Sequence, residues 1–204
     1  PLIEIQTNAL AFGNEFKKYE PYLKKWHSLG LGTIAISIAH YRKEKNKEVY
    51  TPNTEYINLE DLIKKLHEIG YSIRFSCMLM KGFIDSMDEV KELIEFCKKN
   101  KVEQLTVRSI RTPKDPEDEK VYKWTKTHEL SNKNIKKIND FIERNGKKLM
   151  TIEQVGIIYD LNGQNICCAD CLTIKPTTDN IRQLIFFPDG HLRYDWQHKG
   201  AILL

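Results

Sequence analysis

The sequence has no apolar run close to the roughly 20 residues that a membrane-spanning helix requires. It also shows no signal-peptide pattern ahead of its first strand-like segment. The net charge is only +4, and the paired lysines recur mostly on expected helix faces without interleaved aromatic residues. We therefore expect neither a membrane protein nor a nucleic-acid-binding protein.

Cysteine is scarce, and its count of five is odd. Cys77 and Cys97 occupy apolar positions that are typical of buried thiols, whereas Cys167, Cys168 and Cys171 are bunched near the end of the chain. An odd count with isolated buried thiols argues against the disulfide framework of a secreted protein. We expect a reducing, cytoplasmic compartment.

The first residue is a proline rather than a methionine, and it opens directly into a strand-like run at residues 2–7. A natural chain rarely begins in this way, so we expect the sequence to be part of a longer protein. A parallel strand that has lost its neighbour presents an unpaired edge, from which we expect self-association.

What the sequence does contain is ordinary globular material, 41% hydrophobic and 29% charged. Strand-like runs are expected at residues 2–7, 33–38, 73–80 and 104–110. Helical periodicity is expected at residues 15–28, 58–70, 86–97 and 131–146, with long loops at 40–57 and 112–120. Alternating strands and helices predict right-handed crossovers and a parallel sheet or barrel, with the helices outside.

The last part of the chain changes character, because two hairpin signals follow one another. Residues 155–161 and 164–168 flank Asn-Gly, and residues 181–187 and 191–196 flank Pro-Asp-Gly. We therefore predict an α/β fold in two domains. A partial parallel (β/α) barrel is expected over residues 1–150, and a small antiparallel β-hairpin extension with the cysteine group over residues 151–204.

Polar residues gather where the four predicted strands end. They are Gln6, Thr7 and Asn8, then Ser37 and His40, then residues 76–81, then Arg108 and Arg111. Ligands of parallel α/β proteins bind at the carboxyl ends of the strands. Such side chains can bond a ribose, a carboxylate or a phosphate. Any one of them could instead cap a helix or a loop, but four successive polar strand ends favour a binding site.

In order and spacing, these strands resemble strands three to six of the radical S-adenosylmethionine (SAM) enzymes. Residues 3–8 are similar to a third strand that ends in Thr-Asn-Gly, although Ala9 stands in place of the glycine. Residues 35–38 are similar to a fourth strand that carries a ribose-contacting serine. Residues 73–85 are similar to a fifth strand and the glycine-containing turn after it, and residues 104–110 are similar to the sixth strand. The overall resemblance is to the branch that includes the molybdenum-cofactor cyclisation enzyme and its relatives with a cysteine-bearing C-terminal extension. It covers residues 1 to about 112 well and the tail loosely.

The resemblance implies units three to six of a radical SAM core, with SAM lying across the strand ends. It implies contacts from Thr7 and Asn8 to the methionine part, from Ser37 and His40 to the ribose, from Ser76 to SAM, and from Arg108 to the substrate or the SAM carboxylate. It also implies hydrogen abstraction from a small-molecule or peptide substrate. Electrons would come from a donor such as flavodoxin or ferredoxin.

The family's [4Fe–4S] cluster is held by a Cys-x3-Cys-x2-Cys motif after its first strand, and these 204 residues contain no such motif. The resemblance therefore implies that this chain alone is inactive. The alternative is an α/β domain that has lost the cluster and is non-catalytic or binds a metal.

The late cysteines are open to two interpretations. Cys168 and Cys171 have the Cys-x2-Cys spacing that lets two thiolates reach one metal ion, and related tails carry an auxiliary iron–sulfur cluster with which Cys167 would belong. Those relatives place a further cysteine after the second hairpin turn, where this chain has none, so Asp170, His191 or a substrate atom would complete the set. The other interpretation is a reduced, structural cysteine group.

Overall fold

The structure is a computed structural model that describes residues 3–53, 55–112, 118–152, 156–169, 184–194 and 202–203. Seven of its strands form one sheet in the order β1-β2-β3-β4-β7-β6-β5. The strands are β1 (Glu4–Thr7), β2 (Thr33–Ile38), β3 (Ser72–Leu79), β4 (Gln104–Ser109), β5 (Lys147–Ile152), β6 (Gly156–Leu161) and β7 (Gln164–Ala169). The first four and β7 run parallel, and β6 runs antiparallel to both of its neighbours.

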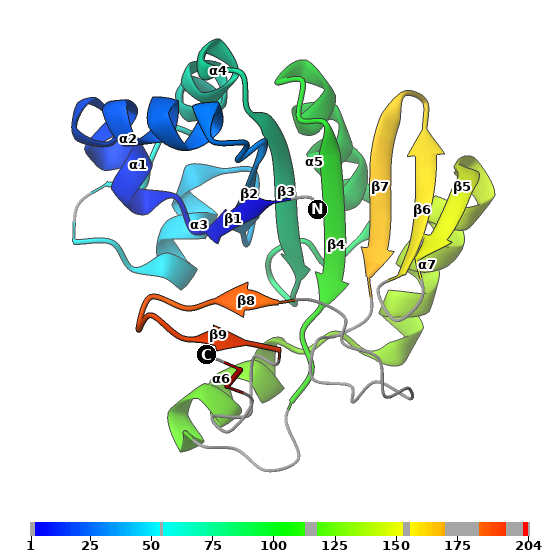
Figure 1. The fold of residues 1–204 in the computed structure, drawn as a ribbon. Coiled ribbons are helices and arrows are strands. Elements are labelled where there is room, and N and C mark those ends of the chain that lie inside the picture. The colour runs from blue at the N-terminus through cyan, green and yellow to red at the C-terminus, as the bar shows by residue number, and fades with distance from the viewer. Residues whose placement is uncertain are drawn as a thin grey trace.

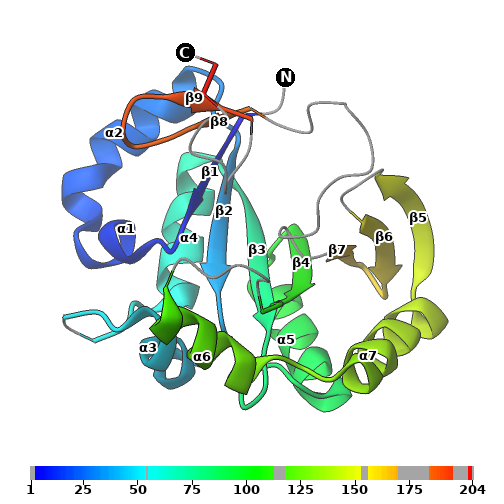
Figure 2. The same cartoon turned by 90° about the horizontal axis from the view of Figure 1, so that it is seen from below.

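Most helices of the described residues lie on one side of this sheet. The helices are α1 (Leu10–Asn14), α2 (Phe16–Ser28), α3 (Lys43–Tyr50), α4 (Leu59–Ile69), α5 (Met87–Lys99), α6 (Glu119–His128) and α7 (Asn132–Asn145). Helix α6 lies beyond the carboxyl ends of β3 and β4 (Figure 1). The sheet is curved and the other helices surround its convex face, as seen from the end where β3 and β4 finish (Figures 1 and 2). The predicted partial (β/α) barrel is confirmed. No helix in the described ranges combines the length and apolarity needed to cross a membrane.

Strand alternation explains why the core lies on the convex side. Every second residue of the central strands is apolar and buried there, as Ile36, Phe75 and Leu105 are. These side chains pack against apolar helix residues such as Leu66 and Leu93. The residues between them must point to the concave face, so the side chains of that face can differ in polarity from those of the core.

The helix starts follow the expected capping chemistry. Asn58 accepts a hydrogen bond from the Asp61 N–H at the start of α4, and Ser86 and Ser131 accept equivalent bonds at the starts of α5 and α7. Gly70 ends α4 with φ 111°, in the left-handed region that favours glycine.

Three elements lie where no regular structure was predicted. Helix α3 occupies the expected loop at 40–57, α6 follows the acidic loop, and β5 extends the sheet at its far edge. Helix α3 buries only Asn46, α6 buries no residue, and every residue of β5 is exposed. Without a buried face these segments carry no apolar periodicity for a sequence reading to detect.

The Asn162-Gly163 hairpin forms as predicted, with both residues at positive φ, and it joins β6 to β7. It continues the barrel sheet, because β7 pairs in parallel with β4. Strand β5 crosses residue 150, and the domain division expected there stays a prediction. The second hairpin forms a separate sheet of β8 (Ile185–Phe186) and β9 (Leu192–Arg193). Both strands are shorter than predicted, since Leu184, Phe187, His191 and Tyr194 are described but lie outside the strands, and residues 181–183 and 195–196 lie outside the described residues.

Candidate functional site

A row of small polar side chains crosses the concave face of the sheet. The strand register places Ser37 of β2 opposite Ser76 of β3, Ser76 opposite Thr106 of β4, and Thr106 opposite Cys167 of β7. Each of the four alternates with convex, core-packed neighbours, so all four belong to the concave face. We call these four residues the polar row. Two of its members, Ser37 and Ser76, are site residues predicted from the sequence.

Two arginines flank the polar row on the same face. Arg74 lies two residues before Ser76 on β3, and Arg108 lies two residues after Thr106 on β4. Arg74 is opposite Ala35, whose methyl group leaves room for the guanidinium to cross β2 and pair with Glu4 on β1. Its Nε is buried and finds no hydrogen-bond partner among the described residues.

Cys167 and Cys168 are consecutive residues of β7, so their side chains point to opposite faces of the sheet. Cys168 packs against the convex core, and burial raises the pKa of its thiol to about 12. Burial also raises the pKa of Cys167, but Arg108 and Arg74 act in the opposite direction. Cys167 is therefore the thiol that shares the concave face with the two guanidiniums.

This placement bears on the predicted metal site. Two thiols on opposite faces of one strand cannot both reach a single ion while the strand keeps its form. Cys171 lies outside the described residues, and within those residues no three His, Cys, Asp or Glu side chains gather as metal ligands. The three-cysteine site stays a prediction.

Thr7 and Asn8 lie at the carboxyl end of β1, where they shape the turn into α1. Thr7 Oγ1 accepts from the Ala9 N–H at 2.9 Å, and Asn8 Oδ1 accepts from the Leu10 N–H at 3.2 Å. Ala9 itself has φ 58°. It thus holds the left-handed conformation that glycine adopts without cost, at the position where the similar enzymes carry glycine.

His40 lies on the helix side of the sheet, and it is only 2% exposed. Its Nε2 is 3.1 Å from Glu89 Oε2 on α5, and its Nδ1 accepts from the Arg42 N–H at 3.0 Å. Burial lowers the pKa of His40, although Glu89 opposes this shift. A ribose contact would have to replace one of these two bonds, so the predicted role of His40 stays a prediction.

The structure thus brings Ser37, Ser76, Arg108 and Cys167 to one face, and it places His40 behind that face. The sequence reading missed Arg74, Thr106 and Glu4, because it considered strand ends only. The available signal was alternation: on β3 and β4, polar residues recur at every second position between apolar ones.

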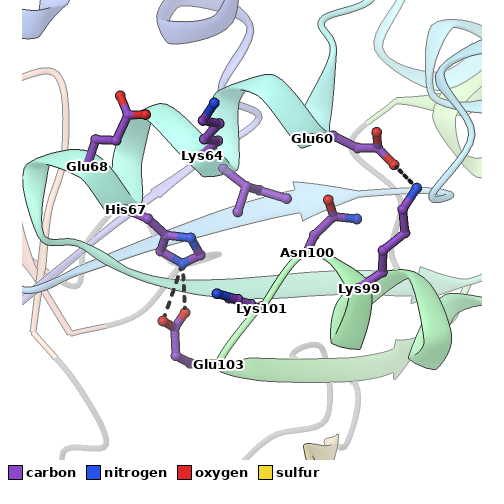
Figure 3. Close-up of a pocket in the computed structure, with 9 residues that line it drawn as sticks. Glu60, Lys64, His67, Glu68, Lys99, Asn100, Lys101 and Glu103 are labelled. Carbon is purple, nitrogen blue, oxygen red and sulfur yellow. Dashed lines mark hydrogen bonds and ion pairs between the residues drawn. The ribbon is translucent and has the colours of Figure 1, made fainter.

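A hollow of about 550 Å³ opens elsewhere, between α4 and the segment that leads into β4 (Figure 3). Its lining is mostly charged: Glu60, Ile63, Lys64, His67, Glu68, Lys99, Asn100, Lys101 and Glu103. His67 Nε2 lies 3.3 Å from Glu103 Oε1, and Lys99 Nζ lies 3.1 Å from Glu60 Oε1. The hollow is at the amino ends of β3 and β4, so it is separate from the strand-end site.

No model of a known protein family matches the sequence, and no curated protein matches it either. Three solved structures of Streptococcus suis SuiB are similar. They are SuiB bound to precursor peptide SuiA (20% identity, TM-score 0.45, 69% of this chain and 29% of that chain), SuiB bound to S-adenosylmethionine (20%, 0.42, 69% and 28%) and SuiB (15%, 0.40, 74% and 30%). The chain therefore spans less than a third of SuiB. A likeness of this degree carries neither activity nor ligand from one protein to the other.

Proposed function

We propose that this chain is part of a radical SAM enzyme, corresponding to units three to six of its core, and that it binds SAM across the carboxyl ends of β1 to β4. The observation that carries the proposal is the pair Ser37 and Ser76, which face one another on adjacent strands at the concave face. Bulky branched residues normally fill the inside of a parallel barrel. Hydroxyls on this face instead favour a bound polar ligand.

The donor set fits SAM chemically. Serine hydroxyls both donate and accept, which suits a ribose or an amino group, and no hydrogen bond links Ser37 or Ser76 to another side chain of the described residues. The guanidinium of Arg108 suits a carboxylate. SAM bound beside a reduced cluster would supply the radical chemistry for hydrogen abstraction from a substrate. The role proposed for this chain's own residues is to bind and orient that cofactor.

The [4Fe–4S] cluster does not fit the described residues, because they hold no three-thiolate group and the sequence contains no Cys-x3-Cys-x2-Cys motif. We therefore propose that its ligands lie elsewhere in the intact protein and that this chain alone is inactive. The proposed substrate is a small molecule or a peptide, and the proposed electron donor is flavodoxin or ferredoxin.

Calorimetric titration of the chain with SAM tests the proposal. The wild-type chain is expected to bind SAM, and Ser37→Ala to weaken binding about fivefold, the effect of losing one hydrogen bond. Ser72→Ala is the matched control, since Ser72 is an exposed residue at the start of β3. A folded wild-type chain that does not bind SAM would contradict the proposal. For the intact protein, anaerobic reconstitution should give iron–sulfur absorbance.

The alternative, a metal-binding domain, rests on the Cys168 and Cys171 spacing. It predicts bound iron or zinc in the purified chain, lost when Cys167, Cys168 and Cys171 are all replaced by serine. Metal analysis of both proteins by mass spectrometry tests whether these cysteines hold a metal, and the SAM titration separates the two functions. Equal metal content in the wild type and the triple variant would exclude this alternative.

A further inference from the structure

Two arginine side chains share the concave face with the polar row. Along β1 to β4, the charged side chains of this face within the described residues are Glu4, Arg74 and Arg108. Glu4 pairs with Arg74. Guanidinium groups bind carboxylates and phosphates in preference to cations.

Arg74 has unused hydrogen-bonding capacity in this place. Glu4 occupies its Nη2, but the buried Nε–H has no partner among the described residues. A buried donor without an acceptor is destabilising, and native proteins rarely leave one unless a water or a ligand completes it. The Nε–H and Nη–H groups of one guanidinium also have the fork geometry that matches a carboxylate or a phosphate.

The two arginines approach the polar row from opposite ends. In register, Arg74 is opposite Gln104, and Arg108 lies four residues further along β4. Their Cα atoms are thus roughly 13 Å apart along the strand direction, at about 3.3 Å per residue. Long arginine side chains on one face can close that gap over Ser76 and Thr106.

We propose that Arg74 and Arg108 form a clamp over the polar row that binds an anionic group, a carboxylate or a phosphate, of the substrate. Glu4 positions Arg74 in this clamp, and the hydroxyls of Ser76 and Thr106 complete the donor set. The inference rests on the proposed function, since it assigns the substrate class to the same face. It adds that the substrate is anionic where it meets the sheet.

Cys167 supplies a reporter inside the clamp. The rate at which iodoacetamide alkylates Cys167, followed by peptide mass spectrometry, should fall saturably as inorganic phosphate is added to the wild-type chain at constant ionic strength. A bound anion at Thr106 shields the neighbouring Cys167 thiol from the reagent. Arg74→Gln and Arg108→Gln should each weaken the phosphate effect about tenfold to a hundredfold. Each variant is compared with its own phosphate-free rate.

Arg144→Gln is the matched control, because it removes the same charge from the exposed end of α7. It should leave phosphate protection unchanged. If an arginine variant does not fold, Ser76→Ala tests the same clamp and should also weaken protection. Absence of phosphate protection in the wild type, or equal protection in all variants, would overturn the clamp.

A parallel SAM titration separates the two proposals. SAM binding without phosphate protection would refute the clamp alone, and phosphate protection without SAM binding would refute the SAM proposal alone. Phosphate protection that persists at saturating SAM supports a substrate site. Loss of phosphate protection at saturating SAM, together with loss of SAM binding in Arg108→Gln, would assign the clamp to the SAM carboxylate and overturn the substrate assignment.

Discussion

Asn46 is completely buried, although the helix that carries it is otherwise charged and mostly exposed. Its Oδ1 accepts from the N–H groups of Ala39 at 2.8 Å and His40 at 3.1 Å, and its Nδ2 donates to the carbonyls of His40 and Arg42. One amide side chain thus satisfies the backbone where β2 ends. It fixes the direction in which the chain leaves the Ser37 strand.

Replacing Asn46 with alanine should therefore destabilise the fold. Two buried backbone N–H groups would lose their acceptor, so we expect the free energy of unfolding to fall by about 2–3 kcal/mol. Chemical denaturation measures this change. Asn134→Ala, at an exposed position of α7, should stay within about 0.5 kcal/mol of wild type. Equal stability of the two variants would show that the Asn46 bonds contribute little.

His40 makes stability depend on pH. Burial lowers its pKa in the folded chain below the ordinary 6.5, with Arg42 and Lys45 acting in the same direction and Glu89 against it. The unfolded chain therefore binds more protons as the pH falls below about 6.5. We expect the free energy of unfolding to have its full value above about pH 6.5 and to decrease as the pH falls below it.

The variant His40→Gln should lose part of this dependence, whereas Asn134→Ala should keep all of it. The measurement is the denaturation midpoint of each protein between about pH 5 and 7, where an ordinary histidine titrates. Nuclear magnetic resonance of the His40 ring gives an independent check. An imidazole that becomes charged at or above its ordinary pKa in the folded chain would contradict the prediction.

Helix α5 packs against the core, and the side chain of one serine caps its amino end. Ser86 Oγ accepts from the Glu89 N–H at 3.2 Å, and Glu89 in turn meets His40. Ser86→Ala should lower the free energy of unfolding by about 1 kcal/mol, the usual effect of losing such a cap. Ser72→Ala, an exposed serine without a capping role, is the control for denaturation. A loss below a few tenths of a kcal/mol would contradict the assignment.

The helices and strands that the sequence predicts well are those with a buried apolar face. Strand β2 and helices α4 and α5 show strong periodicity because Ile36, Leu62 and Leu93 must reach one core. Helix α6 and strand β5 bury nothing, so their conformations depend on neighbours that no local pattern reveals. Only the strand pairing shows that β7 joins β4, because that contact links distant segments.

The residues of the candidate site also differ in how far the sequence could predict them. Ser37, Ser76 and Arg108 were predictable because polar residues at strand ends need no knowledge of pairing. Alternation could have marked Thr106, but its pairing with Cys167 was not predictable, since the two meet only through the β4 and β7 register. The separation of Cys167 from Cys168 likewise follows from strand conformation, whereas both were predicted to belong to one ligand set.

The whole sheet ends in two open edges in the described part of the chain. Strand β1 pairs only with β2, and β5 pairs only with β6. Strand β1 is short and largely polar, but β5 is longer and exposes Leu149 and Met150 by 47% and 55%. An exposed apolar edge with unpaired backbone groups invites pairing with a second copy. We therefore expect the chain to self-associate, and β5 to contribute more than β1.

The double variant Leu149→Lys and Met150→Lys tests this in sedimentation velocity. Lysines on an edge strand oppose pairing, because each added strand would bring like charges together and desolvate them. The wild-type chain should sediment as a dimer or larger, and the double variant should shift toward monomer. Leu29→Lys is the control, since Leu29 is 68% exposed just beyond the end of α2 and belongs to neither edge strand. An unchanged distribution in the double variant would move the association to β1, and a monodisperse wild-type monomer would mean that neither edge pairs.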